Sequence, residues 1–189
     1  MTNFNNSSSL EYAKIINPTK EQIICKAINF HKEGNIAEAL KIYQFCVNKG
    51  LNDYRVFSNF GNILQQLGKL EEAAILSRKA VDLKPNLAHV HFNLGNILKE
   101  LGRLEEAEKS HRKAIKLNPD LKQALNALGD ILLDVGKLKE VILLSKSKLE
   151  SKSITPEDKL RALIQITCAN LQKGDFSETL LYLNKINEL

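Results

Sequence analysis

Glycine recurs at a fixed interval along this chain. Two series share a spacing of 34 residues: Gly34, Gly68, Gly102 and Gly136, and, seven residues ahead, Gly61, Gly95 and Gly129. A period of this length is typical of an array of helical units that stack on their neighbours to bury a continuous core. We therefore expect a helical array, a class of protein that usually binds other chains and rarely catalyses a reaction.

The repeat is clearest in the middle of the chain. Residues 54–87 and 88–121 agree at about half of their positions and share the segments Gly-Asn-Ile-Leu, Leu-Glu-Glu-Ala and Arg-Lys-Ala. Residues 20–53 and 122–155 keep the apolar spacing and the central glycine but lose much of the rest, as outer members of an array do. Four units are predicted, at 20–53, 54–87, 88–121 and 122–155.

Each unit has the pattern of two antiparallel helices. From Val56 to Leu67 the apolar residues recur at steps of three and four, which places them on one side of a helix. Gly68 can take the left-handed conformation that ends a helix. A second amphipathic run follows from Leu70 to about Leu83. The next two residues, Lys84 and Pro85, prevent the helix from continuing. Each helix is expected to have roughly 13 residues and a length of about 20 Å.

The second glycine series falls inside the first helix of each unit, where glycine costs about 1 kcal/mol relative to alanine. Close approach of the two helices would offset that cost. We expect the matching small residues on the second helices to be these four: Ala73, Ala80, Ala107 and Ala114.

These residues resemble the tetratricopeptide repeat family, which has a period of 34, small residues at the eighth, twentieth and twenty-seventh places and proline at the thirty-second. The first unit departs from the pattern with Ala27 and Leu51, and the fourth with Val141 and Lys148. The resemblance implies an all-α fold, a right-handed α-solenoid of stacked helix-turn-helix hairpins. It also implies that the first helix of each hairpin lines an inner groove.

The two ends of the chain differ from the central units. Thr155 to Asp158 has the sequence of an N-cap with proline in the first turn, so we expect a degenerate fifth hairpin over 156–189 that breaks at Gly174. Thr19 to Gln22 resembles a capping box and starts the first helix near Lys20. Residues 1–19, rich in Asn and Ser at their start, are predicted to be disordered or weakly helical.

By the resemblance, a peptide-binding groove would be lined by one set of residues: Arg55, Ser58, Asn59, Asn62, Gln66, His89, Phe92, Asn93, Asn96, Lys99, Asn126 and Asp130. Asparagine offers donors and an acceptor to a peptide backbone, so a ladder of amides could hold an extended chain. The alternative is that these amides bond to neighbouring helices. The function predicted is a protein-interaction scaffold that binds a peptide or a partner protein.

Other partners are less well supported. A clamp for a terminal carboxylate would need cations where Gln123 and Ala127 stand. The net charge of +5 raises nucleic acid as a partner, but the basic residues gather at the ends of the second helices, away from the groove. A different alternative is the non-catalytic docking or dimerisation region of a bacterial transferase acting on sugars, sulfate or methyl groups. Neighbouring genes would discriminate between these functions.

No catalytic constellation, cofactor motif or metal-ligand spacing is present in the sequence, so we predict a protein that is not an enzyme. Cys25, Cys46 and Cys168 are expected to be buried free thiols. No apolar run is long enough for a membrane span, and a cytoplasmic location is expected. The last helix is apolar around most of its circumference, from Phe176 to Leu189. We expect it to be covered, by a second copy in a homodimer or by further sequence.

Overall fold

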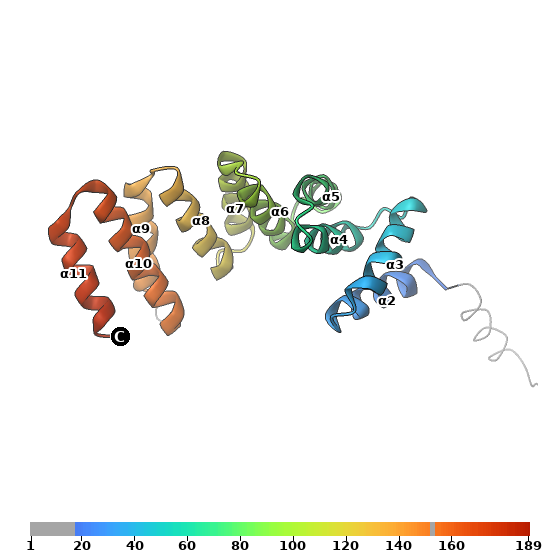
Figure 1. The fold of residues 1–189 in the computed structure, drawn as a ribbon, viewed down its shortest axis with the longest axis horizontal. Coiled ribbons are helices and arrows are strands. Elements are labelled where there is room, and N and C mark those ends of the chain that lie inside the picture. Colours follow the sequence, from blue (N-terminus) through green and yellow to red (C-terminus); the bar gives the residue numbers. More distant parts are fainter. Residues whose placement is uncertain (1–17, 152–153) are drawn as a thin grey trace, which may run out of the picture. The chain divides into compact units, whose positions relative to one another are not determined.

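The computed structural model describes residues 18–151 and 154–189, and all regular structure within them is helical. Residues 1–17, for which a disordered or weakly helical segment is predicted, lie outside the described part. The helices, shown in Figure 1, are α2 (Lys20–Lys32), α3 (Ile36–Asn48), α4 (Tyr54–Gln66), α5 (Leu70–Leu83), α6 (Ala88–Glu100), α7 (Leu104–Leu117), α8 (Lys122–Asp134), α9 (Leu138–Leu149), α10 (Pro156–Lys173) and α11 (Phe176–Asn187).

Consecutive helices pack as hairpins, which confirms the predicted all-α array. α2 packs on α3, α4 on α5, α6 on α7 and α10 on α11. The chain divides between Pro85 and Asn86 into two compact units. The first of these compact units contains α2 to α5, and the second contains α6 to α11. From here on, 'first unit' and 'second unit' refer to these two parts and not to the sequence repeats.

The helix ends follow from local sequence. Thr19 forms the expected capping box, because its hydroxyl accepts from the Gln22 amide at 3.3 Å while the Gln22 side chain accepts from the Thr19 amide at 2.8 Å. The Thr155 hydroxyl caps α10 by accepting from the Asp158 amide at 3.1 Å, with Pro156 in the first turn. Gly68 and Gly174 have φ of +73° and +76°, the left-handed conformation that favours glycine after a helix.

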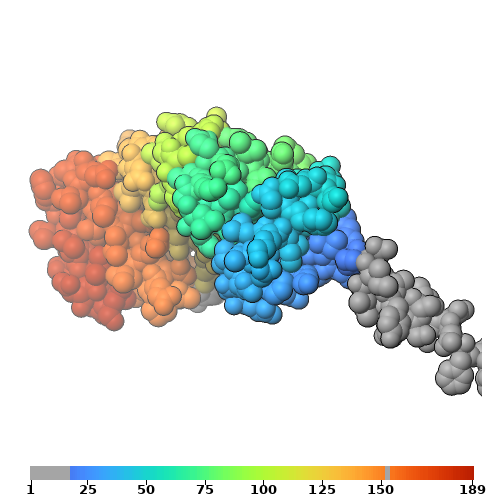
Figure 2. Space-filling view, turned by 45° about the vertical axis from the view of Figure 1, so that its right-hand side comes forward, coloured from blue at the N-terminus to red at the C-terminus, as the bar shows by residue number. Residues whose placement is uncertain are grey.

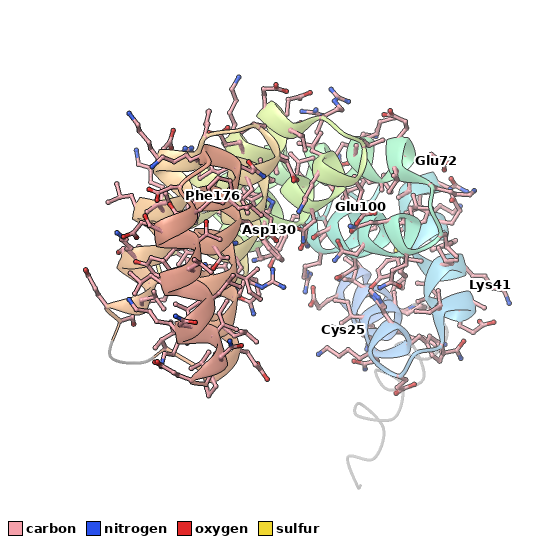
Figure 3. The ribbon with its side chains drawn as sticks, turned by 60° about the vertical axis from the view of Figure 1, so that its left-hand side comes forward. Cys25, Lys41, Glu72, Glu100, Asp130 and Phe176 are labelled. Atoms are coloured by element: carbon pink, nitrogen blue, oxygen red, sulfur yellow. The ribbon has the colours of Figure 1, made fainter. Side chains whose placement is uncertain are left out.

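The core of the first unit is built around one aromatic side chain. Tyr43 on α3 is fully buried and stacks on Phe60 of α4, with the ring centroids 6.3 Å apart. Burial raises the pKa of Tyr43 to about 12, and the side chain of Asn59 opposes that rise. The expectation of buried thiols is met only in part: Cys46 is buried, Cys168 is half-buried and Cys25 is exposed on α2 (Figure 3).

The glycines inside the first helices do allow close approach, but their neighbours are not the predicted set. A Cβ at Gly95 would lie 2.7 Å from Nε2 of His111, and one at Gly129 would lie 2.5 Å from the amide of Gln165 on α10. Only Gly61 has one of the predicted alanines, Ala73, among its nearest neighbours. The alanines are buried, but larger side chains from the same hairpin or the next one fill the space beside Gly95 and Gly129.

The fifth hairpin is anchored by a small apolar core. Leu163, Ile166 and Tyr182 form this core. Three other apolar residues of α10 are exposed by 38%, 45% and 54%: Leu160, Ile164 and Leu171. α10 contacts α8, α9 and α11 and buries several polar side chains: Gln165, Thr167 and Asn170.

Candidate functional site

Helix α4, the first helix of the second hairpin in the first unit, carries five of the predicted groove residues. Arg55 is held by two carboxylates, Glu21 of α2 at 2.6 Å and Asp53 at 3.0 Å. These ion pairs raise the pKa of Arg55 and tie α2 to α4. Ser58 is buried and Asn59 is half-buried near Tyr43. Both side chains are therefore engaged in the hairpin packing.

Asn62 and Gln66 are in a different situation. Asn62 is half-buried, and its amide has no hydrogen-bond partner among the residues that the structure describes. Gln66 is exposed at the end of α4. An accessible amide without an internal partner can bond to another molecule with little rearrangement.

The second unit contains a cleft with a volume of about 420 Å³. Three helices supply its walls: Phe92, Asn96 and Lys99 from α6, Gln123, Asn126, Ala127 and Asp130 from α8, and Glu157, Asp158 and Arg161 from α10. Five of the predicted groove residues thus line one cavity, and a helix of the fifth hairpin closes it.

Phe92, an apolar part of the cleft wall, contacts a buried histidine. Phe92 meets the ring of His111 edge to face, with a centroid distance of 5.6 Å. His111 is 0% exposed, and neither ring nitrogen has a hydrogen-bond partner within the described residues. Burial lowers the pKa of His111 to about 4, so the imidazole is neutral at physiological pH. The other predicted residues of α6 differ in exposure: His89 is exposed and Asn93 is half-buried with a partner.

Asp130 is bound by side chains from two neighbouring helices. It points from α8 toward α10 (Figure 3) and accepts from the Gln165 amide at 2.8 Å and from Arg161 at 3.1 Å. Lys99 of α6 lies 3.9 Å from the same carboxylate. Asp130 therefore joins three helices, and a ligand would have to displace one of these partners to reach it.

Asn126 is also bound internally. Its amide nitrogen donates to Asp158 at 3.0 Å, and its oxygen accepts from Lys148 at 2.8 Å. Lys148 donates as well to Gln165, whose own amide donates to the Asn126 carbonyl at 3.1 Å. Burial lowers the pKa of Lys148 to about 8. For Asn126, the alternative interpretation of amides bonded to neighbouring helices is the one that the contacts support.

Asn96 is the amide in the cleft that resembles Asn62, because its side chain also lacks an internal hydrogen-bond partner. It is half-buried, lines the cavity, and has no hydrogen-bond partner in the part of the chain that is described. Asn62 and Asn96 stand 34 residues apart, at the same place in successive hairpins. Each amide is available for a hydrogen bond to another molecule within its own unit.

Sequence reasoning missed the contribution of α10. Glu157, Asp158 and Arg161 line the cleft, but the interruption after residue 150 removes α10 from the repeat register. One signal was present in the sequence. Lys148 replaces a buried alanine of the repeat, and a lysine in that place needs acceptors from a neighbouring element, which Asn126 and Gln165 provide.

Across residues 18–151 and 154–189, no group of three or more His, Cys, Asp or Glu side chains is arranged to hold a metal ion. Within the same described ranges, every helix is too short or too polar to span a membrane.

Comparison with protein families gives two matches. A family model described as tetratricopeptide repeat matches residues 88–121, and one described as TPR repeat matches residues 61–102. The comparison with curated proteins gives no match.

Several solved structures share the fold. YrrB, described as a TPR protein with an unusual peptide-binding site, has a TM-score of 0.81 and 18% identity, over 96% of this chain and 90% of its own. MamA has a TM-score of 0.76 and 22% identity, over 86% of this chain and 92% of its own. A tetratricopeptide repeat protein from Parabacteroides merdae has a TM-score of 0.76 and 21% identity, over 88% of this chain and 64% of its own.

Proposed function

We propose that this chain, which matches tetratricopeptide repeat models within residues 61–121 and shares the fold of such proteins, is a protein-interaction scaffold that binds an extended segment of a partner protein at the first helices of its hairpins. The observation that carries this proposal is the cleft of about 420 Å³ between α6, α8 and α10, with the unpartnered amide of Asn96 in its wall. The likeness to YrrB, a protein described with a peptide-binding site, is consistent with it.

The chemistry of the cleft suits a peptide better than a nucleic acid. Its lining contains the acidic side chains Asp130, Glu157 and Asp158 and the basic side chains Lys99 and Arg161. Nucleic-acid affinity depends on a surplus of positive charge facing the phosphates, and this lining has none. A peptide backbone needs mixed donors and acceptors, which the amides of Asn96 and Gln123 offer.

In this proposal the amides have unequal roles. Asn96 bonds to the segment in the cleft because no internal bond has to be broken first. Asn62, at the equivalent place of the first unit, is available in the same way to a segment bound there. Asn126 and Asp130 form the floor of the cleft, since their partners on α9 and α10 already use them. Phe92 supplies an apolar contact beside the backbone.

A peptide selected from a random display library on the full chain provides the probe for a test. Its affinity is then measured by fluorescence polarisation for wild type, Asn96→Ala and Asn62→Ala. The matched control is Asn48→Ala, an exposed asparagine on the second helix α3.

We expect Asn96→Ala to weaken binding by roughly 3- to 10-fold, the value of one or two hydrogen bonds. Asn62→Ala should weaken peptides that bind at the first unit, and Asn48→Ala should have no effect. Selected peptides that bind Asn96→Ala and Asn62→Ala as tightly as wild type would exclude the first-helix amides as the binding surface.

A further inference from the structure

The last helix exposes an apolar stripe. Phe176, Leu180 and Leu183 follow each other at steps of four and three on α11, and their exposures are 67%, 62% and 41%. The red atoms of α11 lie at one edge of its unit in Figure 2, and Phe176 is labelled in Figure 3. Its other side is packed, because Thr179 and Tyr182 are buried.

The earlier hairpins bury the equivalent positions. Counting from the glycine that ends each first helix, the ninth residue is Leu183 on α11 and Tyr43, His111 and Ser145 on α3, α7 and α9. Each of these three counterparts is 0% exposed. The counterparts of Leu180 are buried or half-buried, and so are those of Phe176.

The following hairpin contributes to covering these positions. Tyr43 stacks on Phe60 of α4, and Ser145 donates to Gln165 of α10 at 3.0 Å. α7 likewise packs against α8. The stripe on α11 is therefore a continuation of the interface by which one hairpin packs on the next.

We propose that this stripe, Phe176, Leu180 and Leu183, is the contact surface of a homodimer in which α11 of one copy packs antiparallel on α11 of a second copy. This inference goes beyond partner binding at the cleft and does not depend on it.

The opposite end of the array does not offer a matching surface. The residue of α2 equivalent to Phe60 of α4 is Lys26, which is exposed. Gln22 and Asn29 of α2 are also exposed. In head-to-tail stacking, the leucines of α11 would contact the lysine and the two amides on α2 of another copy. In a contact between two α11 helices, leucines would contact leucines. An isologous, two-fold contact is therefore favoured.

The helix dipoles agree with an antiparallel arrangement. In an antiparallel pair the positive N-terminal end of one helix lies beside the negative C-terminal end of the other. A parallel pair would bring like ends together.

Sedimentation velocity over a concentration series tests the proposal on the full chain. The variant is Leu180→Glu, which is compatible with the monomer fold because the side chain is 62% exposed. The control is Leu143→Glu, which changes a leucine on the second helix α9 that is 73% exposed. Circular dichroism checks that both variants keep the helical content of the wild type.

Wild type and Leu143→Glu should sediment with twice the mass of one chain at the upper concentrations. Leu180→Glu should raise the dissociation constant by at least about 100-fold, because the dimer would bury two unpaired carboxylates. Three results would overturn the proposal: a monomeric wild type throughout, a mass that keeps growing as in head-to-tail stacking, or equal effects of the two variants.

Discussion

Replacing Gly95 by alanine tests the packing that holds the cleft wall. On an exposed helix this change would stabilise the protein by about 1 kcal/mol, because alanine has the better helix propensity. Here the new Cβ would lie 2.7 to 2.9 Å from three atoms of the His111 ring. Ordinary contact begins near 3.4 Å, and the ring is fully buried and also meets Phe92, so any shift of the ring disturbs that contact.

The magnitude follows from these two opposing effects. Overpacking a filled site costs about 1–3 kcal/mol, and the upper end applies because the whole ring has to move. After the gain in propensity, Gly95→Ala should lower the free energy of unfolding by about 2 kcal/mol. For a chain of this size the melting temperature should fall by roughly 4–8 °C.

The assay is urea unfolding of a double-mutant cycle. In the His111→Ala background the ring is gone, so Gly95→Ala should stabilise by up to about 1 kcal/mol, and the effect changes sign. The coupling between the two positions should be about 3 kcal/mol. If Gly95→Ala has the same effect in both backgrounds, or stabilises the wild type, the argument from close approach is wrong.

Two further predictions concern buried polar groups of the second unit. Gln165→Leu removes the partner of Ser145, Lys148 and Asp130, so it should lower the free energy of unfolding by about 2–4 kcal/mol in urea denaturation; an unchanged midpoint would contradict the network. Burial lowers the pKa of His111 to about 4 in the folded protein, so the unfolded chain takes up this proton first as the pH falls below 6.5. Stability is then lost between pH 6.5 and 4, by up to roughly 3 kcal/mol, and the wild type should lose more than His111→Ala; parallel pH profiles would show that the imidazole is not the cause.

The hairpins could be predicted from the sequence because their ends are set locally. Gly68 ends α4 at a positive φ, and Thr155 with Pro156 starts α10. These signals act over a few residues, so one sequence contains them. The apolar periodicity then determines which side of each helix is buried.

The detail of the cleft depends on contacts between distant residues, which the repeat pattern does not contain. Gln165 reaches back to Asn126 and Asp130 across 39 and 35 residues. Asn62, Asn96 and Asp130 follow each other at steps of 34 residues, and all three are predicted groove residues. Of these three, Asp130 is the one that bonds to α10. The difference comes from α10, which has 18 residues and does not follow the 34-residue repeat of the earlier hairpins.

Hydrogen–deuterium exchange of the chain with a selected peptide bound tests the central claim most directly. The account predicts that the peptide slows exchange in α6, α8 and the start of α10, which line the cleft, and leaves the second helices α7 and α9 unchanged. Protection confined to α7 and α9, or none in α6, would contradict a binding surface on the first helices.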